Sequence, residues 1–98
     1  RKSLIGLVLV VDIRRELTEL DTQMLDWFAP QKKPIHVLLT KSDKVSKDKS
    51  LRTLNKINNE LKEKWGGKFN VECSAQLFSS LKKQGIEKAT EKIEQWLT

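Results

Sequence analysis

The side chains of Thr40, Lys41 and Asp43 have the types and the spacing of a group that could bind a nucleobase. An ionised aspartate offers two acceptor oxygens and no donor, so it pairs with two N–H groups that lie side by side. Guanine presents such a pair at N1 and N2, whereas adenine would direct a ring-nitrogen lone pair at the carboxylate and leave the charge unpaired. Lys41 can lay its methylene stem along the face of a base while its ammonium stays in water.

A strand must precede this polar cluster for it to lie at a binding site. The apolar run from Ile35 to Leu39 follows Pro34 and stops at Thr40, which is typical of a buried strand in a parallel sheet. Ligands of open α/β sheets bind beyond the carboxyl ends of the strands. A Thr-Lys-x-Asp quartet in a random chain is usually a solvated turn, but its place between this strand and a helix favours the functional interpretation.

The remaining elements alternate in type along the chain. In order, we expect a strand from Leu4 to Val11, a helix capped by Thr18 and stopped by Pro30, the central strand, a long helix from the cap region Val45 to Asp48 as far as Gly66-Gly67, a strand from Phe69 to Phe78, and a helix after Gly85. This β-α-β-α-β-α order requires parallel strands joined by right-handed crossovers. The sequence therefore predicts an α/β fold, with a parallel sheet in three layers.

Apolar side chains recur at helical spacing in the first two predicted helices. They are Leu20, Met24, Leu25, Trp27 and Phe28 in the first helix, and Leu51, Leu54, Ile57, Leu61 and Trp65 in the second. Stripes at steps of three and four residues are typical of helices that cover a core. We therefore expect both stripes to be buried. The first strand, which is apolar throughout, is expected to be covered on both faces.

The sequence lacks the motifs of metal-binding proteins and of hydrolases with a nucleophilic serine. The sequence has no cluster of residues with metal-ligand spacing and no Gly-x-Ser-x-Gly, so it predicts neither metal-binding nor catalytic residues. His36 lies inside the central strand and is expected to be a packed side chain. Asp12 and Arg14 follow the first strand, and they either reach the crevice or pair with each other at the rim of the sheet. Spacing alone favours the pairing.

Length, charge and cysteine content describe one small domain of ordinary type. The 98 residues are 38% hydrophobic and 33% charged. No apolar run approaches the roughly 20 residues of a membrane span, and Cys73 has no partner for an internal disulfide, so we expect a cytoplasmic protein that does not bind membranes. The net charge of +6 favours a polyanionic partner such as nucleic acid, or merely keeps the domain soluble.

The cluster Thr40-Lys41-Ser42-Asp43 resembles the guanine-recognition motif [Asn/Thr]-Lys-x-Asp of the GTPase superfamily. Members of that superfamily close the base pocket with a Ser-Ala-like pair after the next strand, whose backbone N–H groups meet the guanine oxygen. Ser74-Ala75 fits this pair by its letters, and Ser79-Ser80 fits it by its position at the end of the strand. We favour Ser79 and Ser80, because the other choice would leave Leu77 and Phe78 in a loop.

Longer motifs are similar to those of one family within that superfamily. They are Asp12-Ile13-Arg14, Thr18-Glu19-Leu20-Asp21, Leu38 to Lys44 and, above all, Phe78-Ser79-Ser80-Leu81-Lys82-Lys83-Gln84-Gly85-Ile86. Together they resemble the EngB family, also called YsxC or YihA, of bacterial ribosome-biogenesis GTPases. The resemblance implies a TRAFAC-class P-loop GTPase that uses GTP, GDP and Mg²⁺, acts in assembly of the large ribosomal subunit, and is linked to cell division and septation.

The same resemblance implies roles for individual residues. Thr40, Lys41 and Asp43 would bind guanine and ribose, with Lys44 as a weaker extension of the motif, and Ser79 and Ser80 would hold the base oxygen. The sequence departs from the family in lacking Gly-x-x-x-x-Gly-Lys-[Ser/Thr], the threonine switch and Asp-x-x-Gly, which bind phosphates and magnesium. Residues 1–98 therefore resemble the carboxyl-terminal half of such a domain, with guanine recognition present and the phosphate-binding half absent.

Three expectations about activity and partners follow from this partial resemblance. The chain alone should contact guanine weakly and should not hydrolyse GTP. Its basic helices are expected to contact the large ribosomal subunit or its rRNA, and the alternative function is an rRNA-binding module that does not depend on nucleotide. The strand at 4–11, without the neighbour it has in the family, is expected to pair with another chain or with a partner.

Overall fold

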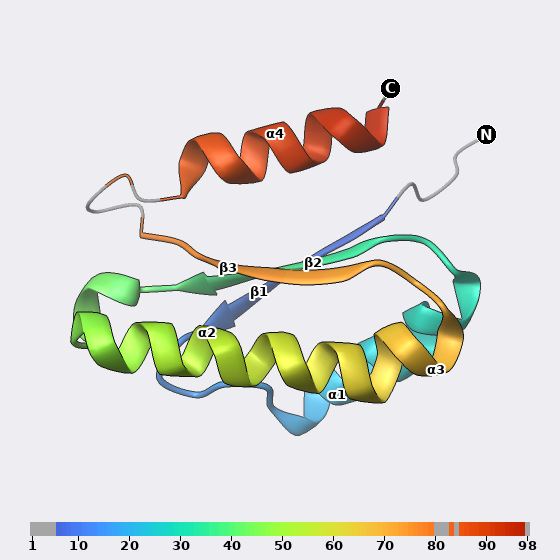
Figure 1. The fold of residues 1–98 in the computed structure, drawn as a ribbon, viewed down its shortest axis with the longest axis horizontal. Coiled ribbons are helices and arrows are strands. Elements are labelled where there is room, and N and C mark those ends of the chain that lie inside the picture. The colour runs from blue at the N-terminus through green and yellow to red at the C-terminus, as the bar shows by residue number, and fades with distance from the viewer. Residues whose placement is uncertain (1–5, 80–82, 84, 98) are drawn as a thin grey trace.

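Three parallel strands form the centre of the molecule (Figure 1). The computed structural model describes residues 6–79, 83 and 85–97. The strands are β1 (Leu7–Asp12), β2 (Ile35–Thr40) and β3 (Cys73–Leu77), in the sheet order β1-β2-β3. Leu7 lies opposite Ile35, and Ile35 lies opposite Cys73. The parallel α/β fold predicted from the sequence is confirmed.

Helices cover the two faces of this sheet as separate layers. Figure 1 shows α1 (Glu19–Phe28) and α2 (Lys47–Leu61) below the sheet, and α4 (Ile86–Leu97) above it. A short 3₁₀ turn, Ala29–Gln31, continues α1. The architecture is therefore the expected three-layer arrangement with β2 as the central strand.

The main core lies between the sheet and the pair α1 and α2. Ile35, Val37 and Leu39 of β2 point to this side, as alternate residues of a strand must, and each is at most 1% exposed. They pack in one cluster with buried side chains of the helices, namely Leu25, Phe28, Ile57, Leu61 and Trp65. The other parity of β2 begins with His36, which is also buried but faces α4 with polar partners.

Both predicted helix starts are confirmed by side-chain caps. The Thr18 hydroxyl accepts a hydrogen bond from the Asp21 backbone N–H at 3.3 Å, and the Thr18 N–H donates to the Asp21 carboxylate at 3.0 Å. The Ser46 hydroxyl accepts from the Lys49 N–H at 3.1 Å. These bonds satisfy N–H groups that have no partner within the first helical turn, so each helix begins at the residue its local sequence specifies.

The apolar stripe predicted for the first helix is buried only in part. Leu25 and Phe28 are completely buried, but Leu20 is 73% exposed, Met24 44% and Trp27 62%. The expectation that the whole stripe packs in the core is therefore wrong. The helix lies at the β1 side of the sheet, so only the narrow face that contains Leu25 and Phe28 meets the core. Helical spacing identifies an apolar face but does not say how much of it a neighbouring element covers.

The predicted helix end at Gly66-Gly67 is also wrong. The helix continues through a π-helical turn, Lys62–Gly66, and α3 (Gly67–Phe69), and it ends at Asn70 in the left-handed conformation with φ 54°. The Val71 N–H donates to the Gly66 carbonyl at 3.1 Å, which satisfies one terminal acceptor. Because Phe69 is helical, the third strand begins at Cys73 and has five residues instead of the ten expected.

The first strand is less covered by neighbouring elements than its apolar sequence predicts. Leu4 and Ile5 lie outside the described residues, and Val10 is 62% exposed, so β1 is not covered on both faces. Val10 belongs to the face of the sheet on which α4 packs. One helix is about 10 Å wide and three strands span about as much between their axes, so a single helix leaves part of an edge strand exposed.

Candidate functional site

The carboxyl ends of the strands bring the predicted site residues to one edge of the sheet. Thr40 is the last residue of β2, and Asp12, the last residue of β1, lies directly opposite it. The Thr40 hydroxyl donates to the Val11 carbonyl at 3.2 Å. Ser79 follows β3 by two residues. Parallel strands end at the same edge, and that is why residues from three distant segments meet here.

Asp43 and Ser79 are joined by a direct hydrogen bond. The Ser79 hydroxyl donates to Asp43 Oδ1 with an oxygen–oxygen distance of 2.7 Å. Ser79 is completely buried and Asp43 is half-buried. A short bond of this kind to a carboxylate is among the stronger hydrogen bonds in proteins, so it orients the aspartate side chain. The structure thus brings together two residues that are predicted to contact different sides of a base.

Backbone contacts hold the turn that carries Asp43 against the end of the third strand. Residues Ser42–Lys44 form a 3₁₀ turn. The Ser42 N–H and hydroxyl both donate to the Phe78 carbonyl, at 3.3 and 3.2 Å, and the Phe78 N–H donates to the Leu39 carbonyl at 2.9 Å. Ser42 is buried, although it occupies the variable position of the Thr-Lys-x-Asp motif. A small hydroxyl residue at this position allows the two segments to approach.

Lys41 has a left-handed backbone with φ 60° and ψ 34°. This conformation costs a residue other than glycine about 1–2 kcal/mol. The Lys44 N–H donates to the Lys41 carbonyl at 2.9 Å and closes the turn, and both lysine side chains are exposed. Among the described residues other than glycine, four more have positive φ, namely Glu16, Lys32, Asn70 and Lys83. The conformation of Lys41 therefore explains how the chain turns after β2, but it does not by itself mark a binding site.

A pocket of about 310 Å³ lies beside Asp43. Its lining residues are Ser42, Asp43, Val45, Lys47, Ser50, Leu51 and Leu77. Among the described residues predicted for the site, only Asp43 lines it. Leu51 is 44% exposed at this pocket and not buried in the core, so the prediction for this residue is wrong. Three of the lining side chains are apolar and four are polar, so the pocket offers an apolar surface beside a carboxylate, an ammonium and two hydroxyls.

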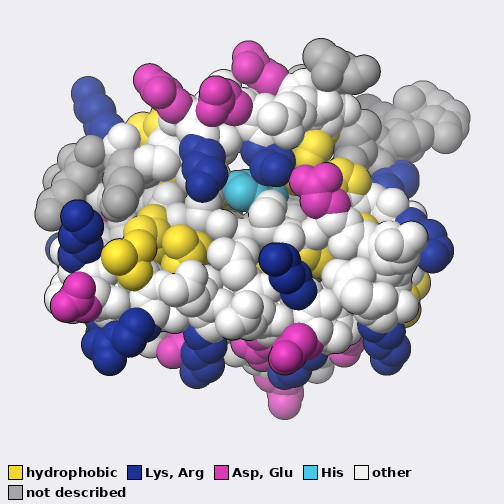
Figure 2. Space-filling model, in the orientation of Figure 1, with side chains coloured by type: hydrophobic (Ala, Val, Ile, Leu, Met, Phe, Trp, Pro, Cys, Tyr) yellow, Lys and Arg dark blue, Asp and Glu magenta, His cyan; other side chains and the backbone are white. Residues whose placement is uncertain are grey.

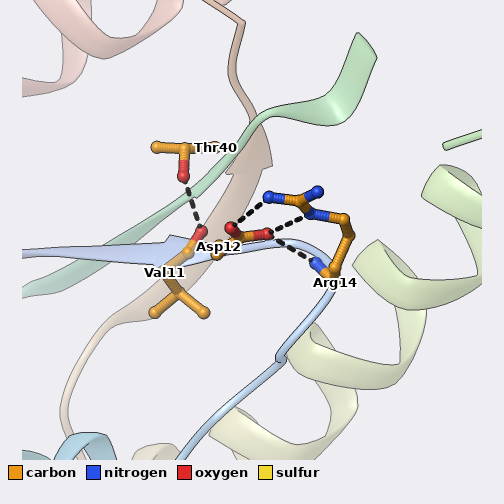
Figure 3. A network of polar contacts seen from close by, with 4 residues as sticks. All are labelled: Val11, Asp12, Arg14 and Thr40. Atoms are coloured by element: carbon orange, nitrogen blue, oxygen red, sulfur yellow. Dashed lines mark hydrogen bonds and ion pairs between the residues drawn. The ribbon is translucent and has the colours of Figure 1, made fainter. Parts of the chain in front are cut away.

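Asp12 and Arg14 pair with each other at the rim of the sheet (Figure 3). The Arg14 backbone N–H and Nε donate to Asp12 Oδ1 at 2.9 and 3.2 Å, and Nη2 donates to Oδ2 at 3.0 Å. The side-chain hydrogen bonds from Arg14, followed by its backbone bond, lower the pKa of Asp12 to about 2. Asp12 correspondingly raises the pKa of Arg14, with a smaller contribution from the charge of Asp43. The pairing favoured by the sequence spacing is confirmed.

The two serine pairs considered for the base oxygen have different places in the fold. Ser74 and Ala75 lie inside β3, opposite His36 and Val37, and the Ser74 hydroxyl is 2.7 Å from His36 Nδ1. They are therefore away from the edge where Asp43 lies. Ser79 is at that edge, and Ser80 lies outside the described residues.

The described part of the chain offers few other side chains that could bind a metal ion or act as a nucleophile or base. No group of three His, Cys, Asp or Glu side chains there could hold a metal ion, and no helix there is long and apolar enough to cross a membrane. His36 is 1% exposed, which confirms that it is a packed side chain, and burial lowers its pKa. Burial also raises the pKa of the Cys73 thiol to about 11, which makes it a poor nucleophile at neutral pH.

Comparisons with known proteins identify relatives over nearly the whole chain. The chain is 54% identical over 92 residues to a protein of Methylobacillus flagellatus named "Probable GTP-binding protein EngB", a match that covers 94% of this chain and 42% of the relative. It is 53% identical over 97 residues to the protein of that name from Azoarcus sp., covering 99% and 44%. The chain thus spans less than half the length of these relatives. A scan against protein-family models finds no match.

Solved structures with the same fold include two elongation factors. Translation elongation factor SelB from Methanococcus maripaludis, in its apo form, superposes with a TM-score of 0.77 at 21% identity, over 92% of this chain and 19% of that one. A bacterial selenocysteine-specific elongation factor gives a TM-score of 0.73 at 24% identity, over 95% and 15%. These likenesses concern the fold alone. By sequence, nearly the whole chain is similar to part of proteins named as EngB GTP-binding proteins, and by fold it matches part of two elongation factors.

Proposed function

We propose that this chain carries the guanine-recognition site of an EngB-type GTP-binding protein. The observation that supports the proposal best is the hydrogen bond from Ser79 to Asp43, because it orients a half-buried carboxylate at the edge of the sheet where ligands of this fold class bind. The pocket beside Asp43 adds apolar walls next to that carboxylate. The names of the relatives, which are GTP-binding proteins, agree with this chemistry.

Each residue of the site has a distinct proposed role. Asp43 accepts hydrogen bonds from N1–H and N2–H of guanine, and the stem of Lys41 lies along the base. Thr40 supports the turn from the end of β2 and faces the ribose. Ser79 orients Asp43, and Ser80 contributes its backbone N–H to the base oxygen. Lys44 extends the motif as an exposed cation near the nucleotide.

The experiment that tests this proposal is a backbone-amide NMR titration of the chain with GDP. Shifts confined to residues 40–44 and to Ser79 are expected with GDP and not with ADP. Asp43→Asn replaces one acceptor oxygen with a donor that would oppose N1–H, so it should weaken GDP binding by about tenfold or more. A well-dispersed spectrum that GDP does not change would overturn the proposal.

We further propose that the chain alone does not hydrolyse GTP. Phosphoryl transfer depends on a phosphate cradle, a lysine and Mg²⁺ that neutralise charge around the phosphates. The 98 residues contain no Gly-x-x-x-x-Gly-Lys-[Ser/Thr] sequence, and the described side chains include no cluster fit for a metal ion. These two observations support the proposal that the chain recognises the guanine base but does not hold a magnesium-bound triphosphate by itself. Phosphate release above a blank without protein would contradict this proposal.

For the whole protein, we propose a GTPase of the bacterial cytoplasm that acts in assembly of the large ribosomal subunit and is linked to cell division and septation. The support is the sequence similarity to EngB proteins together with the net charge of +6, which suits a partner made of RNA. Depletion of the protein should cause immature large subunits to accumulate in ribosome profiles. A normal profile in depleted cells would contradict this assignment.

The alternative function is binding to rRNA without dependence on nucleotide. Lys49, Arg52 and Lys56 line one shallow hollow on the surface of α2, and this arrangement favours contact with a phosphate backbone. Against it, Lys56 already pairs with Glu16 at 2.8 Å, and Figure 2 shows Lys and Arg side chains interspersed with Asp and Glu over the face it displays. RNA affinity that falls steeply with salt and ignores GDP would support this alternative.

We also propose that the open edge of β1 pairs with another polypeptide. Among the described strands, β1 pairs only with β2, and Val10 leaves an apolar side chain exposed beside that edge. Exposed strand edges with apolar side chains favour strand pairing. The occupant is either a second copy of the chain or a partner. Light scattering at high concentration should show a species larger than the monomer, and a clean monomer would argue against self-association.

A further inference from the structure

Three cations form a line along one side of α2. Lys49, Arg52 and Lys56 line a hollow of about 390 Å³ together with Thr53. Their spacing of three and four residues places them on one face of the helix, over about 10 Å of its length. Among the described residues, a carboxylate lies within 4 Å of Lys56 but of neither Lys49 nor Arg52. The hollow therefore presents more positive than negative charge.

The stability of α2 does not account for this line of cations. Like charges three and four residues apart repel each other on a helix. Lys49 also lies in the first helical turn, three residues after the cap Ser46, where the positive end of the helix dipole disfavours a cation. Residues that break local rules without a gain in stability are expected at functional positions. The arrangement therefore favours an anionic ligand from outside the chain.

A glutamate from another segment occupies one end of the line. Glu16, in the turn after β1, places its Oε1 2.8 Å from Lys56 Nζ. Its backbone is left-handed, with φ 57°, a conformation that is strained for glutamate, and its N–H donates to the Asp12 carbonyl at 3.2 Å. The side chains of Lys56 and Glu16 remain 65% and 38% exposed. Water and salt screen such a pair, so a polyanion can replace the carboxylate.

The hollow fits a phosphate backbone better than it fits other anionic partners. The apolar face of α2 is buried in the core through Ile57 and Leu61, so it is not available for insertion into a membrane surface. No described aromatic side chain lines the hollow, whereas the centres of protein interfaces are enriched in such anchors. Cations repeated at short spacing match the repeated charges of a nucleic-acid strand.

We propose that the hollow of Lys49, Arg52 and Lys56 binds the phosphate backbone of RNA, and that Glu16 is its internal competitor. The Glu16 carboxylate takes the place of one phosphate on Lys56 until RNA displaces it. This inference rests on the proposed RNA partner of the whole protein. It adds the surface that makes the contact and a residue that limits the affinity of that surface.

The test measures binding of a labelled RNA duplex of about 16 base pairs by fluorescence anisotropy at several salt concentrations. Glu16→Gln removes the competing charge, and Arg52→Gln removes one cation of the hollow. Glu16→Asn, which suits a left-handed backbone, is the second variant if the first does not fold. The matched controls are Glu94→Gln and Lys88→Gln, which make the same changes of net charge at exposed positions of α4, across the sheet from α2 (Figure 1).

Opposite changes are expected from the two variants of the hollow. Glu16→Gln should bind the duplex about threefold to tenfold more tightly, and Arg52→Gln about threefold to tenfold more weakly. The slope of log affinity against log salt should steepen by about 0.7–0.9 in Glu16→Gln and flatten by as much in Arg52→Gln, because one phosphate contact is gained or lost. Both controls should stay within about twofold of the wild type. In a Lys56→Gln background, Glu16→Gln should no longer tighten binding.

Each contrary result removes a separate part of the inference. Equal effects of the hollow variants and their controls would overturn the assignment of the hollow and leave RNA as a partner. A gain from Glu16→Gln that persists in Lys56→Gln would overturn the competitor role. Vesicles rich in phosphatidylserine, or polyglutamate, that bind as tightly as the duplex would overturn the choice of RNA. A folded wild type that does not bind the duplex at low salt would overturn the proposed RNA partner and this inference together.

Discussion

Ser79 donates its hydroxyl hydrogen to Asp43 across 36 residues of sequence, with an oxygen–oxygen distance of 2.7 Å. The bond joins the turn after β2 to a residue that lies two positions after the end of β3. Ser79 therefore supports the Asp43 carboxylate, and in the proposed guanine site this carboxylate is oriented before a ligand binds. Ligand binding then costs less side-chain entropy than it would with a free aspartate.

Loss of the Ser79 hydroxyl should therefore weaken guanine binding without removing the aspartate. Hydrogen bonds to charged groups contribute about 1.5–3 kcal/mol, of which the nucleotide recovers part when it replaces the lost donor. We expect Ser79→Ala to raise the dissociation constant for GDP by about threefold to tenfold in an NMR titration. Ser74→Ala, which removes a serine hydroxyl from the interior of β3, is the control and should leave GDP affinity unchanged.

Stability should fall in acid as the Asp12 carboxylate is protonated. Its pKa is lowered in the folded chain from the ordinary 3.8 to about 2 by the hydrogen bonds from Arg14. A lowered carboxylate pKa contributes stability that is complete above the unfolded value and is lost as the pH falls through the folded one. In urea unfolding from pH 5 to pH 2, the free-energy difference between the wild type and Arg14→Met should be constant above pH 4 and shrink below it. A constant difference down to pH 2 would show that the pair does not contribute.

His36 should make the chain less stable as the pH falls below about 6.5, the value for a free histidine. Burial lowers its folded pKa, the charges of Lys92 and Lys88 lower it further, and the bond to Gln76 and the charge of Glu72 raise it. The unfolded chain then binds a proton that the folded chain does not, so the stabilising effect is complete above 6.5 and declines below it. His36 is the sole histidine of the sequence. Unfolding free energies of the wild type should therefore drop between pH 7 and pH 5.5, and those of His36→Gln should change much less.

Gly85→Ala should be destabilising far beyond the usual cost of adding a methyl group. The positive φ and the close approach of the Leu77 carbonyl leave no room for a Cβ atom, so we expect a loss of about 2 kcal/mol or more in the free energy of unfolding. Gly67→Ala is the comparison, because Gly67 has helical φ of −71° and its nearest atom to a new Cβ is 3.2 Å away. Its effect should stay within about 1 kcal/mol. Equal effects at the two glycines would contradict the structure at Gly85.

The exposed part of the α1 stripe should tolerate charge, in contrast to the buried part. Leu20→Lys and Trp27→Lys should each change the free energy of unfolding by about 0.5 kcal/mol or less in a monomer, since both side chains are mostly exposed. Leu25→Ala should cost about 2–5 kcal/mol, because Leu25 is completely buried. Chemical denaturation measures both. A large loss in Trp27→Lys at high concentration alone would instead indicate that a second copy covers this face.

Features that depend on neighbouring residues in the chain could be predicted from the sequence. The capping box at Thr18 and the side-chain cap at Ser46 form because each hydroxyl reaches the N–H group three residues ahead. The apolar run of β2 and the polar cluster after it likewise specify a strand that ends at Thr40. Glycines were less informative, because Gly66 and Gly67 adopt helical angles and the left-handed cap falls on Asn70.

Exposure and site lining were harder to predict, for a physical reason. Which part of an apolar helical face is buried depends on where the helix lies relative to the sheet, so Leu20, Met24 and Trp27 could not be told from Leu25 by spacing. Leu51 fits a core stripe by its spacing, yet it lines the pocket beside Asp43. Ser42 occupies the variable position of the motif, so the sequence does not predict a role for it. In the structure its two hydrogen bonds to the Phe78 carbonyl hold the turn in place.

The sequence by itself determined the order of the elements and the placement of Thr40 at the end of a buried strand with Lys41 and Asp43 directly after it, because both follow from local patterns of apolar and polar residues. Only the tertiary structure decided which side chains meet, such as Ser79 with Asp43 and Gln76 with His36 and Gly85. These partners come from different strands and turns. Their contacts depend on the parallel register of β2 and β3 and on the position of α4 against the sheet. Both of these arise from the packing of the whole chain.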